Sequence, residues 1–195
     1  MFADEYFSPT YLRNATAYGS SPRLRADIVV NNLTGTALTL GEVRLQSDGS
    51  PWRPLVHVED IARAFLAVLS ANRHVVHDQA FNVGRDEDVV QIRSIAMAVS
   101  QKTGAPVTFA EGAAPDSRDY RVDFGKIRRV LPSFRPRWTM PAGIDQLMTD
   151  MTRHGFTSED LERTCVRLQR IDELQTSGLL DDQPRSTHER PAVAV

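Results

Sequence analysis

The stretch Asp48–Ala71, DGSPWRPLVHVEDIARAFLAVLSA, constrains the fold more than any other part of the chain. It opens with Asp48-Gly49, a dipeptide that favours a tight turn. The alternating, β-prone residues from Arg53 to Val58 predict a short strand. Apolar residues then recur at helical spacing, and Asp60 can cap this helix by accepting from amides of its first turn. The order turn, strand, tight junction and amphipathic helix predicts an α/β unit.

Composition excludes several classes of protein. With 195 residues, 41% of them hydrophobic and 25% charged, the chain is long enough for one globular domain, or a domain with an appendage. A formal net charge of -2 gives no indication of a nucleic-acid or membrane partner. No stretch approaches the length of a membrane span, and the N-terminus lacks the pattern of a signal peptide. We therefore expect a cytoplasmic location. The single cysteine, Cys165, excludes an internal disulfide and lies on a helical apolar stripe, which favours a buried structural thiol.

Arg53 stands at the start of the predicted strand, where its guanidinium can hold an anion with a fork of donors. The alternative is an exposed charge without a ligand. The preceding Trp52 could pack over a base or sugar, or belong to the core, and the residues alone leave both readings open.

The segment RPLVHVEDIARAF resembles a motif of the NAD-dependent epimerase/dehydratase family, the extended short-chain dehydrogenase/reductases, written R-x-(F/Y/L)-(I/V)-H/Y-V-x-D-(I/L/V)-A-x-A. In that family the arginine holds the diphosphate of a nucleotide sugar. The resemblance therefore implies this role for Arg53.

A second segment resembles the family's L-R-x-x-N-x-Y-G-P strand and loop, with Leu12, Arg13, Tyr18 and Gly19 in the matching places. The family's asparagine, which touches the phosphate side of the substrate, falls on Thr16, whose hydroxyl can donate one hydrogen bond. The alternative is a buried strand end whose polar groups satisfy the loop backbone.

Helical spacing over Arg23–Leu40 predicts a helix that Gly35 interrupts softly. Within it, Asn31-Asn32-Leu33 resembles the N-N-L of nucleotide-sugar epimerases, which implies that Asn32 meets the diphosphate. Asparagine is unfavourable in helices, so two of them favour a placed polar role, although exposed asparagines on helices are common.

Residues 116–127 resemble the family's late substrate loop, D-x-R-x-Y-x-x-D-x-x-K-I. In the family's sugar-nucleotide dehydratases an arginine here makes a second diphosphate contact, and Arg118 takes that position. The alternative for Arg118 is a salt bridge with Asp116 or Asp119.

Three further patterns are assigned structural roles. Asp86-Glu87-Asp88 precedes a predicted helix, whose N-terminal dipole favours carboxylates. His74 and His77 have no third ligand nearby, so we expect solvated histidines and no metal site. Ser158–Glu173 predicts a last helix, with Leu161, Cys165, Leu168, Ile171 and Leu174 on one stripe. We divide the chain into a substrate-binding part (1–156), a C-terminal helix (157–180) and a disordered tail (181–195).

Two motifs of the family are absent. The dinucleotide site needs a Gly-rich turn between a strand and a helix, and no such turn occurs here. The chemistry needs a tyrosine with a lysine four residues later to lower its pKa. The positions four residues after the tyrosines hold Thr10, Ala15, Pro22 and Phe124. We therefore assign no catalytic and no cofactor-binding residue, and NAD or NADP would belong to a longer parent protein.

The sequence thus predicts an α/β fold: the C-terminal part of a Rossmann-type sheet plus a small α/β substrate-binding lobe. The predicted function is nucleotide-sugar binding in an NAD-dependent epimerase/dehydratase-like protein, through Thr16, Asn32, Arg53 and Arg118, without catalysis by this chain alone. The alternative is a non-catalytic subunit that assembles through its C-terminal helix, as a homodimer or with a partner chain. An open sheet edge would favour reduced stability or self-association.

Overall fold

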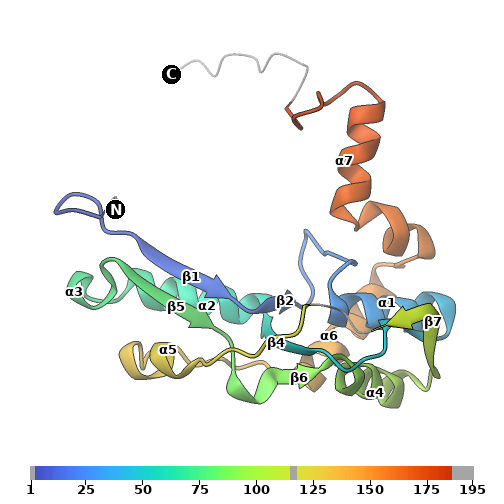
Figure 1. Ribbon diagram of the computed structural model, residues 1–195, viewed down its shortest axis with the longest axis horizontal. Helices are drawn as coiled ribbons and strands as arrows, with labels where there is room; N and C mark the ends of the chain where they lie inside the picture. The colour runs from blue at the N-terminus through green and yellow to red at the C-terminus, as the bar shows by residue number, and fades with distance from the viewer. Residues whose placement is uncertain (1–2, 115–117, 186–195) are drawn as a thin grey trace.

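The computed structural model describes residues 3–114 and 118–185, and its strands form small, mainly parallel sheets (Figure 1). β1 (Thr10–Asn14) pairs parallel with β5 (Gln79–Val83), and β3 (Val43–Ser47) pairs parallel with β7 (Val107–Ala114). β4 (Trp52–His57) lies between β2 (Thr16–Tyr18), which is parallel to it, and β6 (Val89–Gln91), which is antiparallel.

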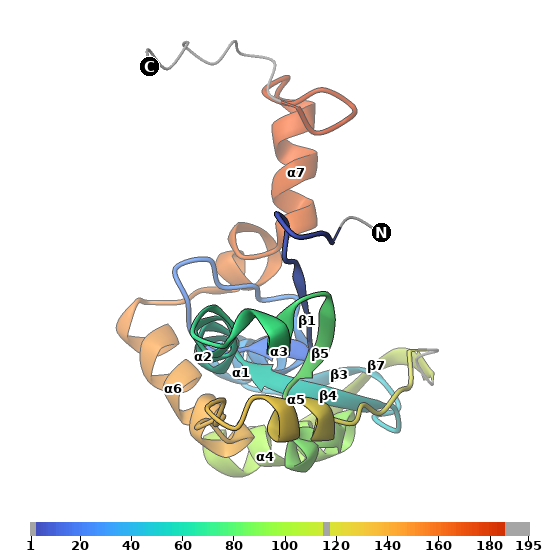
Figure 2. The same cartoon turned by 90° about the vertical axis from the view of Figure 1, so that its left-hand side faces the viewer.

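Helices surround these strands (Figures 1 and 2). They are α1 (Val29–Leu40), α2 (Val58–Leu69), α3 (Arg73–Val76), α4 (Ile92–Thr103), α5 (Gly125–Val130), α6 (Met140–Arg153) and α7 (Arg167–Thr176). A 3₁₀ turn η1 (Asp86–Asp88) precedes β6, and a π-helical turn η2 (Asp160–Thr164) precedes α7. The last helix, α7, projects away from the body in both views.

β4 joins two hydrophobic clusters, because successive side chains of a strand point to opposite faces. Leu55 belongs to the cluster formed with α1, α4 and α6, whereas Val56 belongs to the cluster formed with α2, α5 and β5. Both side chains are buried. The strand that carries Arg53 is therefore fixed by core packing on both sides.

The first helix is shorter than the sequence predicts, because α1 begins at Val29 rather than at Arg23. Residues 23–28 form a loop that two side chains of α1 hold in place. The amide groups of Asn31 and Asn32 donate to the carbonyls of Arg25 and Ala26, each at 3.0 Å. Side-chain bonds of this kind stabilise a non-helical backbone in residues 23–28. The helix therefore begins later than the spacing of apolar residues predicts.

Gly35 does not interrupt α1, contrary to the prediction. It is buried where the C-terminal segment crosses the helix, and a β-carbon there would lie 2.9 Å from Cδ1 of Leu161 and 3.3 Å from the ring of Phe156. The missing side chain therefore allows close packing.

The prediction of one helix over 158–173 is wrong. The segment forms η2, breaks at Cys165-Val166 and resumes as α7. The carbonyl of Cys165 accepts from the backbone N–H of Ala26 at 2.9 Å, so the break docks on the loop before α1. Cys165 is half-buried rather than fully buried as predicted, and this partial burial raises the pKa of its thiol. Of the predicted tail, residues 181–185 form a turn around Asp181, and 186–195 lie outside the described residues.

The acidic run 86–88 does not cap the helix that follows it. The first amides of α4, from Ile92 and Arg93, donate to the carbonyls of Pro51 and Gly49. Asp86 instead accepts from the N–H of Phe124 at the start of α5. Asp88 accepts from the backbone of Met140, the first residue of α6, and burial raises its pKa. Asp86 and Asp88 therefore do bind the N-termini of helices, but of α5 and α6, which lie much later in the sequence.

Replacing Gly143 of α6 by alanine should destabilise the protein. Helix propensity alone would favour alanine, but its β-carbon would overlap the ring of the buried Tyr18. Overpacking of this kind costs about 1–3 kcal/mol, measurable by urea unfolding. Thr149→Ala, on the exposed side of the same helix, should change the free energy of unfolding by no more than about 0.5 kcal/mol. Equal stability of both variants would contradict the packing.

Candidate functional site

His57, the last residue of β4, caps α2. Its Nδ1 accepts from the backbone N–H of Glu59 at 3.2 Å, and its Nε2 lies 2.8 Å from Oε1 of Gln146 in α6. The side chain is 1% exposed and stacks on Trp138, with ring centroids 4.0 Å apart. Burial lowers the pKa of this histidine. The predicted cap, Asp60, therefore does not cap its own helix.

Asp60 instead holds a distant segment against α2. Its carboxylate is 1% exposed and accepts from the backbone N–H groups of Arg137 and Trp138, each at 2.9 Å. Arg63 supplies an ion pair at 3.2 Å. The carboxylate thus exchanges its hydration for three donors, which joins the β4–α2 junction to the segment that leads into α6.

Arg53 lies at the opposite end of β4, where it is opposite Val90 of β6 and only 8% exposed. Its Nη1 donates to the carbonyl of Trp52 at 2.8 Å, and its guanidinium lies 5.7 Å from the ring centroid of Tyr120. Thr16 is opposite Leu55, two residues along β4 from Arg53. Since residues i and i+2 share a face, the structure brings Thr16 and Arg53 to one face of the β2–β4 pair.

The segment after residue 117 folds onto the start of β4. The carboxylate of Asp119 accepts from the backbone N–H of Trp52 at 2.7 Å, and the guanidinium of Arg121 lies 3.7 Å from the Trp52 ring centroid. Arg118 is exposed and immediately precedes this contact. Two of the sites predicted from distant motifs, Arg53 and Arg118, therefore belong to neighbouring segments.

Sequence reasoning missed the part played by Tyr120 and Arg121. The tyrosine lies within the quoted loop pattern, but nothing in the local sequence indicates that Arg121 stacks on Trp52, 69 positions earlier. Of the two acidic partners suggested for Arg118, Asp119 binds the backbone of Trp52, and Asp116 lies outside the described residues.

Asn32 lies on α1, where its side-chain amide donates to the carbonyl of Ala26 within the chain. Its buried neighbour Asn31 accepts from the N–H of Gly19 at 3.0 Å, directly after β2. The asparagine pair therefore fixes the loop between β2 and α1. A role for Asn32 toward a ligand stays a prediction.

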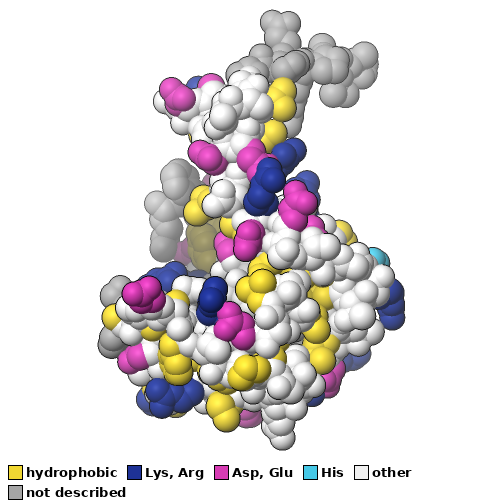
Figure 3. Space-filling view, turned by 90° about the vertical axis from the view of Figure 1, so that its right-hand side faces the viewer, with side chains coloured by type: hydrophobic (Ala, Val, Ile, Leu, Met, Phe, Trp, Pro, Cys, Tyr) yellow, Lys and Arg dark blue, Asp and Glu magenta, His cyan; other side chains and the backbone are white. Residues whose placement is uncertain are grey.

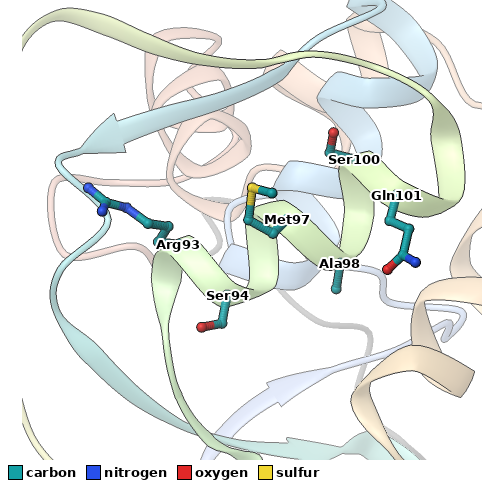
Figure 4. A pocket seen from close by; sticks show the side chains of 6 residues that line it. All are labelled: Arg93, Ser94, Met97, Ala98, Ser100 and Gln101. Atoms are coloured by element: carbon teal, nitrogen blue, oxygen red, sulfur yellow. The ribbon is translucent and has the colours of Figure 1, made fainter.

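Two surface hollows lie away from these residues. One, of about 630 Å³, is lined by Asn72, Arg73, His74 and His77. The other, of about 620 Å³, follows the outer side of α4 from Arg93 to Gln101 (Figure 4). His77 contacts the hydroxyl of Ser8 at 3.0 Å. Within residues 3–114 and 118–185, no three His, Cys, Asp or Glu side chains are grouped to hold a metal ion.

The sequence of residues 1–84 matches the model of the NAD dependent epimerase/dehydratase family. The match covers 84 of the 195 residues, and over this part the chain is similar to that family. Its region contains Thr16, Asn32 and Arg53 together with the β4–α2 junction.

Solved structures with the same fold come from this group of enzymes. UDP-glucuronic acid 4-epimerase from Bacillus cereus, in complex with UDP-glucuronic acid and NAD, matches 76% of this chain with 20% identity and a TM-score of 0.64. Epimerase Mth375 from Methanothermobacter thermautotrophicus matches 78% with 19% identity and a TM-score of 0.65. MoeE5 in complex with UDP-glucuronic acid and NAD matches 74% with 25% identity and a TM-score of 0.61.

The chain spans less than half the length of these relatives, covering 46%, 47% and 47% of them. The predicted fold class is confirmed: the α/β arrangement matches part of a Rossmann-like epimerase fold. No helix in the described ranges combines the length and hydropathy needed to cross a membrane.

Asp60→Asn tests the carboxylate at the β4–α2 junction. The amide would turn one donor group toward the donating backbone of Arg137 and Trp138, and it would lose the charge that Arg63 meets. Hydrogen bonds to charged groups contribute about 1.5–3 kcal/mol, and we expect a loss of this size in thermal or urea unfolding. Asp145→Asn removes a largely exposed partner of Lys102 and should cost less than about 1 kcal/mol. Equal losses of unfolding free energy in the two variants would show that the buried bonds of Asp60 contribute no more to stability than an exposed ion pair.

Proposed function

We propose that this chain supplies the diphosphate-binding face of an NAD-dependent nucleotide-sugar epimerase/dehydratase-like protein. The observation that carries the proposal is the placement of Arg53, a nearly buried guanidinium on a strand that packs into both clusters. The guanidinium's fork of donors suits the two charged oxygens of a diphosphate. The Arg53 side chain is also held by Trp52 and Tyr120, which limits the entropy lost on binding.

Thr16 and Arg118 extend this face. The hydroxyl of Thr16 lies on the same side of the β2–β4 pair as Arg53, where it can donate to a phosphate oxygen. Arg118 precedes the contact between Asp119 and Trp52 and can bring a second guanidinium to the ligand. Asn32 is the least supported of the four, because its amide must exchange the carbonyl of Ala26 for the ligand.

Catalysis requires residues that this chain does not have. The neighbours named above include complexes with NAD, but the Gly-rich turn and the Tyr-x-x-x-Lys motif are absent from this sequence. The residues present therefore do not fit the dinucleotide. We assign NAD or NADP binding and the proton-transfer residues to a longer parent, and propose that this chain cannot catalyse alone. The cytoplasm is the location proposed for it.

Arg53→Ala should weaken binding of a nucleotide sugar. Loss of charge-assisted hydrogen bonds worth about 1.5–3 kcal/mol corresponds to a rise in Kd of about 10- to 150-fold. The measurement is isothermal titration calorimetry with UDP-glucuronic acid, UDP-glucose and dTDP-glucose. Arg53→Lys should bind more tightly than Arg53→Ala but less tightly than wild type, because lysine restores the positive charge without the paired donors of the guanidinium.

The matched control is Arg44→Ala, which removes an exposed arginine of β3 that forms an ion pair with Glu42. It should leave the Kd unchanged. Equal affinities for wild type, Arg53→Ala and Arg44→Ala, or no binding by the folded wild type, would exclude the proposed diphosphate site.

A second candidate function is assembly through α7. This helix projects from the body, and Leu168 on it is 75% exposed. Its charges are satisfied locally: Glu173 meets Arg163 at 2.8 Å and Arg170 at 3.1 Å. Figure 3 shows acidic and basic side chains intermixed on this projecting segment. A partner helix would therefore be held through apolar contacts.

Sedimentation velocity tests this candidate with two variants. If α7 mediates association, Leu168→Glu should shift the protein to the monomer, because a charge would be buried in the contact. Gln169→Glu adds the same charge at the next exposed position and should not do so. A wild type that sediments as a monomer at every concentration would rule out self-association through α7.

A further inference from the structure

The ring of His57 is enclosed by four elements. A β-carbon at Gly19, after β2, or at Gly143, in α6, would meet the imidazole ring. Trp138 covers one face of the ring, and Tyr18 packs edge-on with centroids 5.2 Å apart. The ring therefore cannot move unless α6 or the loop after β2 moves with it.

The hydrogen bonds of His57 specify its neutral form. Oε1 of Gln146 accepts from the backbone N–H of Ser20 at 3.2 Å, which fixes the orientation of the amide. Nε2 of His57 must then donate to this oxygen, and Nδ1 must accept from the N–H of Glu59. A second proton would sit on Nδ1, directly against that N–H.

Protonation turns Nδ1 from an acceptor into a donor, and the charged groups named below do not supply it with an acceptor. Glu59 and Asp60 favour the imidazolium, whereas Arg63 opposes it, and all three lie on α2. The carboxylate of Asp60 is already bonded to Arg137, Trp138 and Arg63. At Tyr18, which packs edge-on against the ring, the carboxylate of Asp88 raises the pKa of the phenol and the guanidinium of Arg85 lowers it.

We propose that His57 is a pH-operated latch: its protonation breaks the cap of α2 and releases α6 and the loop after β2 from each other. The imidazolium cannot keep Nδ1 against the Glu59 N–H, and the enclosed ring passes the displacement to Gln146 and Ser20. Every contact in the latch lies within the chain, so its transition can be measured without a nucleotide sugar.

The sign of the pH effect follows from burial. The folded state lowers the pKa of His57, so its contribution to stability is complete above the ordinary value near 6.5 and declines as pH falls toward the folded value. Burial raises the pKa of Asp88, whose contribution therefore grows as pH falls. Because these two contributions have opposite pH dependence, the contribution of His57 to stability is obtained only by comparing wild type with a His57 variant.

Trp138 reports directly on the latch. In a Trp52→Phe background it is the sole tryptophan, and it stacks on His57. Its fluorescence should change reversibly between pH 7.5 and 5, with a midpoint below about 6.5. His57→Gln should abolish the transition, whereas His154→Gln, at the exposed end of α6, should keep it.

Gln146→Glu provides a second test of the latch, which does not depend on whether His57→Gln folds. A carboxylate at this position favours the imidazolium and should move the midpoint upward by about one pH unit or more. Across the transition, hydrogen exchange corrected for intrinsic pH dependence should show loss of protection at the amides of Ser20, Arg137 and Trp138.

Three results would overturn the latch: a fluorescence transition that survives His57→Gln, a midpoint that Gln146→Glu leaves unchanged, or amide protection that stays constant while His57 titrates.

Discussion

The buried carboxylate of Asp60 determines how α2 meets the segment that leads into α6. It receives two backbone N–H groups and a guanidinium, so α2 and the segment before α6 are joined at one point. A buried carboxylate is stable only when such donors replace its hydration. His57, three residues earlier, completes the junction by capping α2 and contacting Gln146. The position of α6, and of Tyr18 beneath it, follows from these contacts.

The same junction sets the position of the candidate site. β4 is fixed at its end by His57 and at its start by β6 and Asp119. Arg53 therefore stands on a rigid strand, and Thr16 follows from the register between β2 and β4. Binding residues held by a rigid scaffold are the usual arrangement for a binding site. Three of the four residues proposed for the binding face, Thr16, Asn32 and Arg53, lie within residues 1–84, the part that matches the family model.

The sequence predicted the local elements well where a periodic pattern met a clear stop signal. The β4–α2 unit agrees with expectation, since a strand over Trp52–His57 leads directly into a helix over Val58–Leu69. Prediction from the sequence failed where side chains act over long distances. Asp60, Asp86 and Asp88 were assigned to their own helices, but each binds backbone from a segment far along the chain. The contact between Arg121 and Trp52 has no local signal for the same reason.

The most direct measurement is phosphorus NMR of UDP-glucuronic acid titrated with the folded chain, because it observes the diphosphate itself. If Arg53 and its neighbours form the proposed face, both phosphorus signals should shift and broaden on addition of wild type, and remain nearly unchanged with Arg53→Ala. Unchanged signals with the wild type, at concentrations where the protein is folded, would contradict a diphosphate site on this chain.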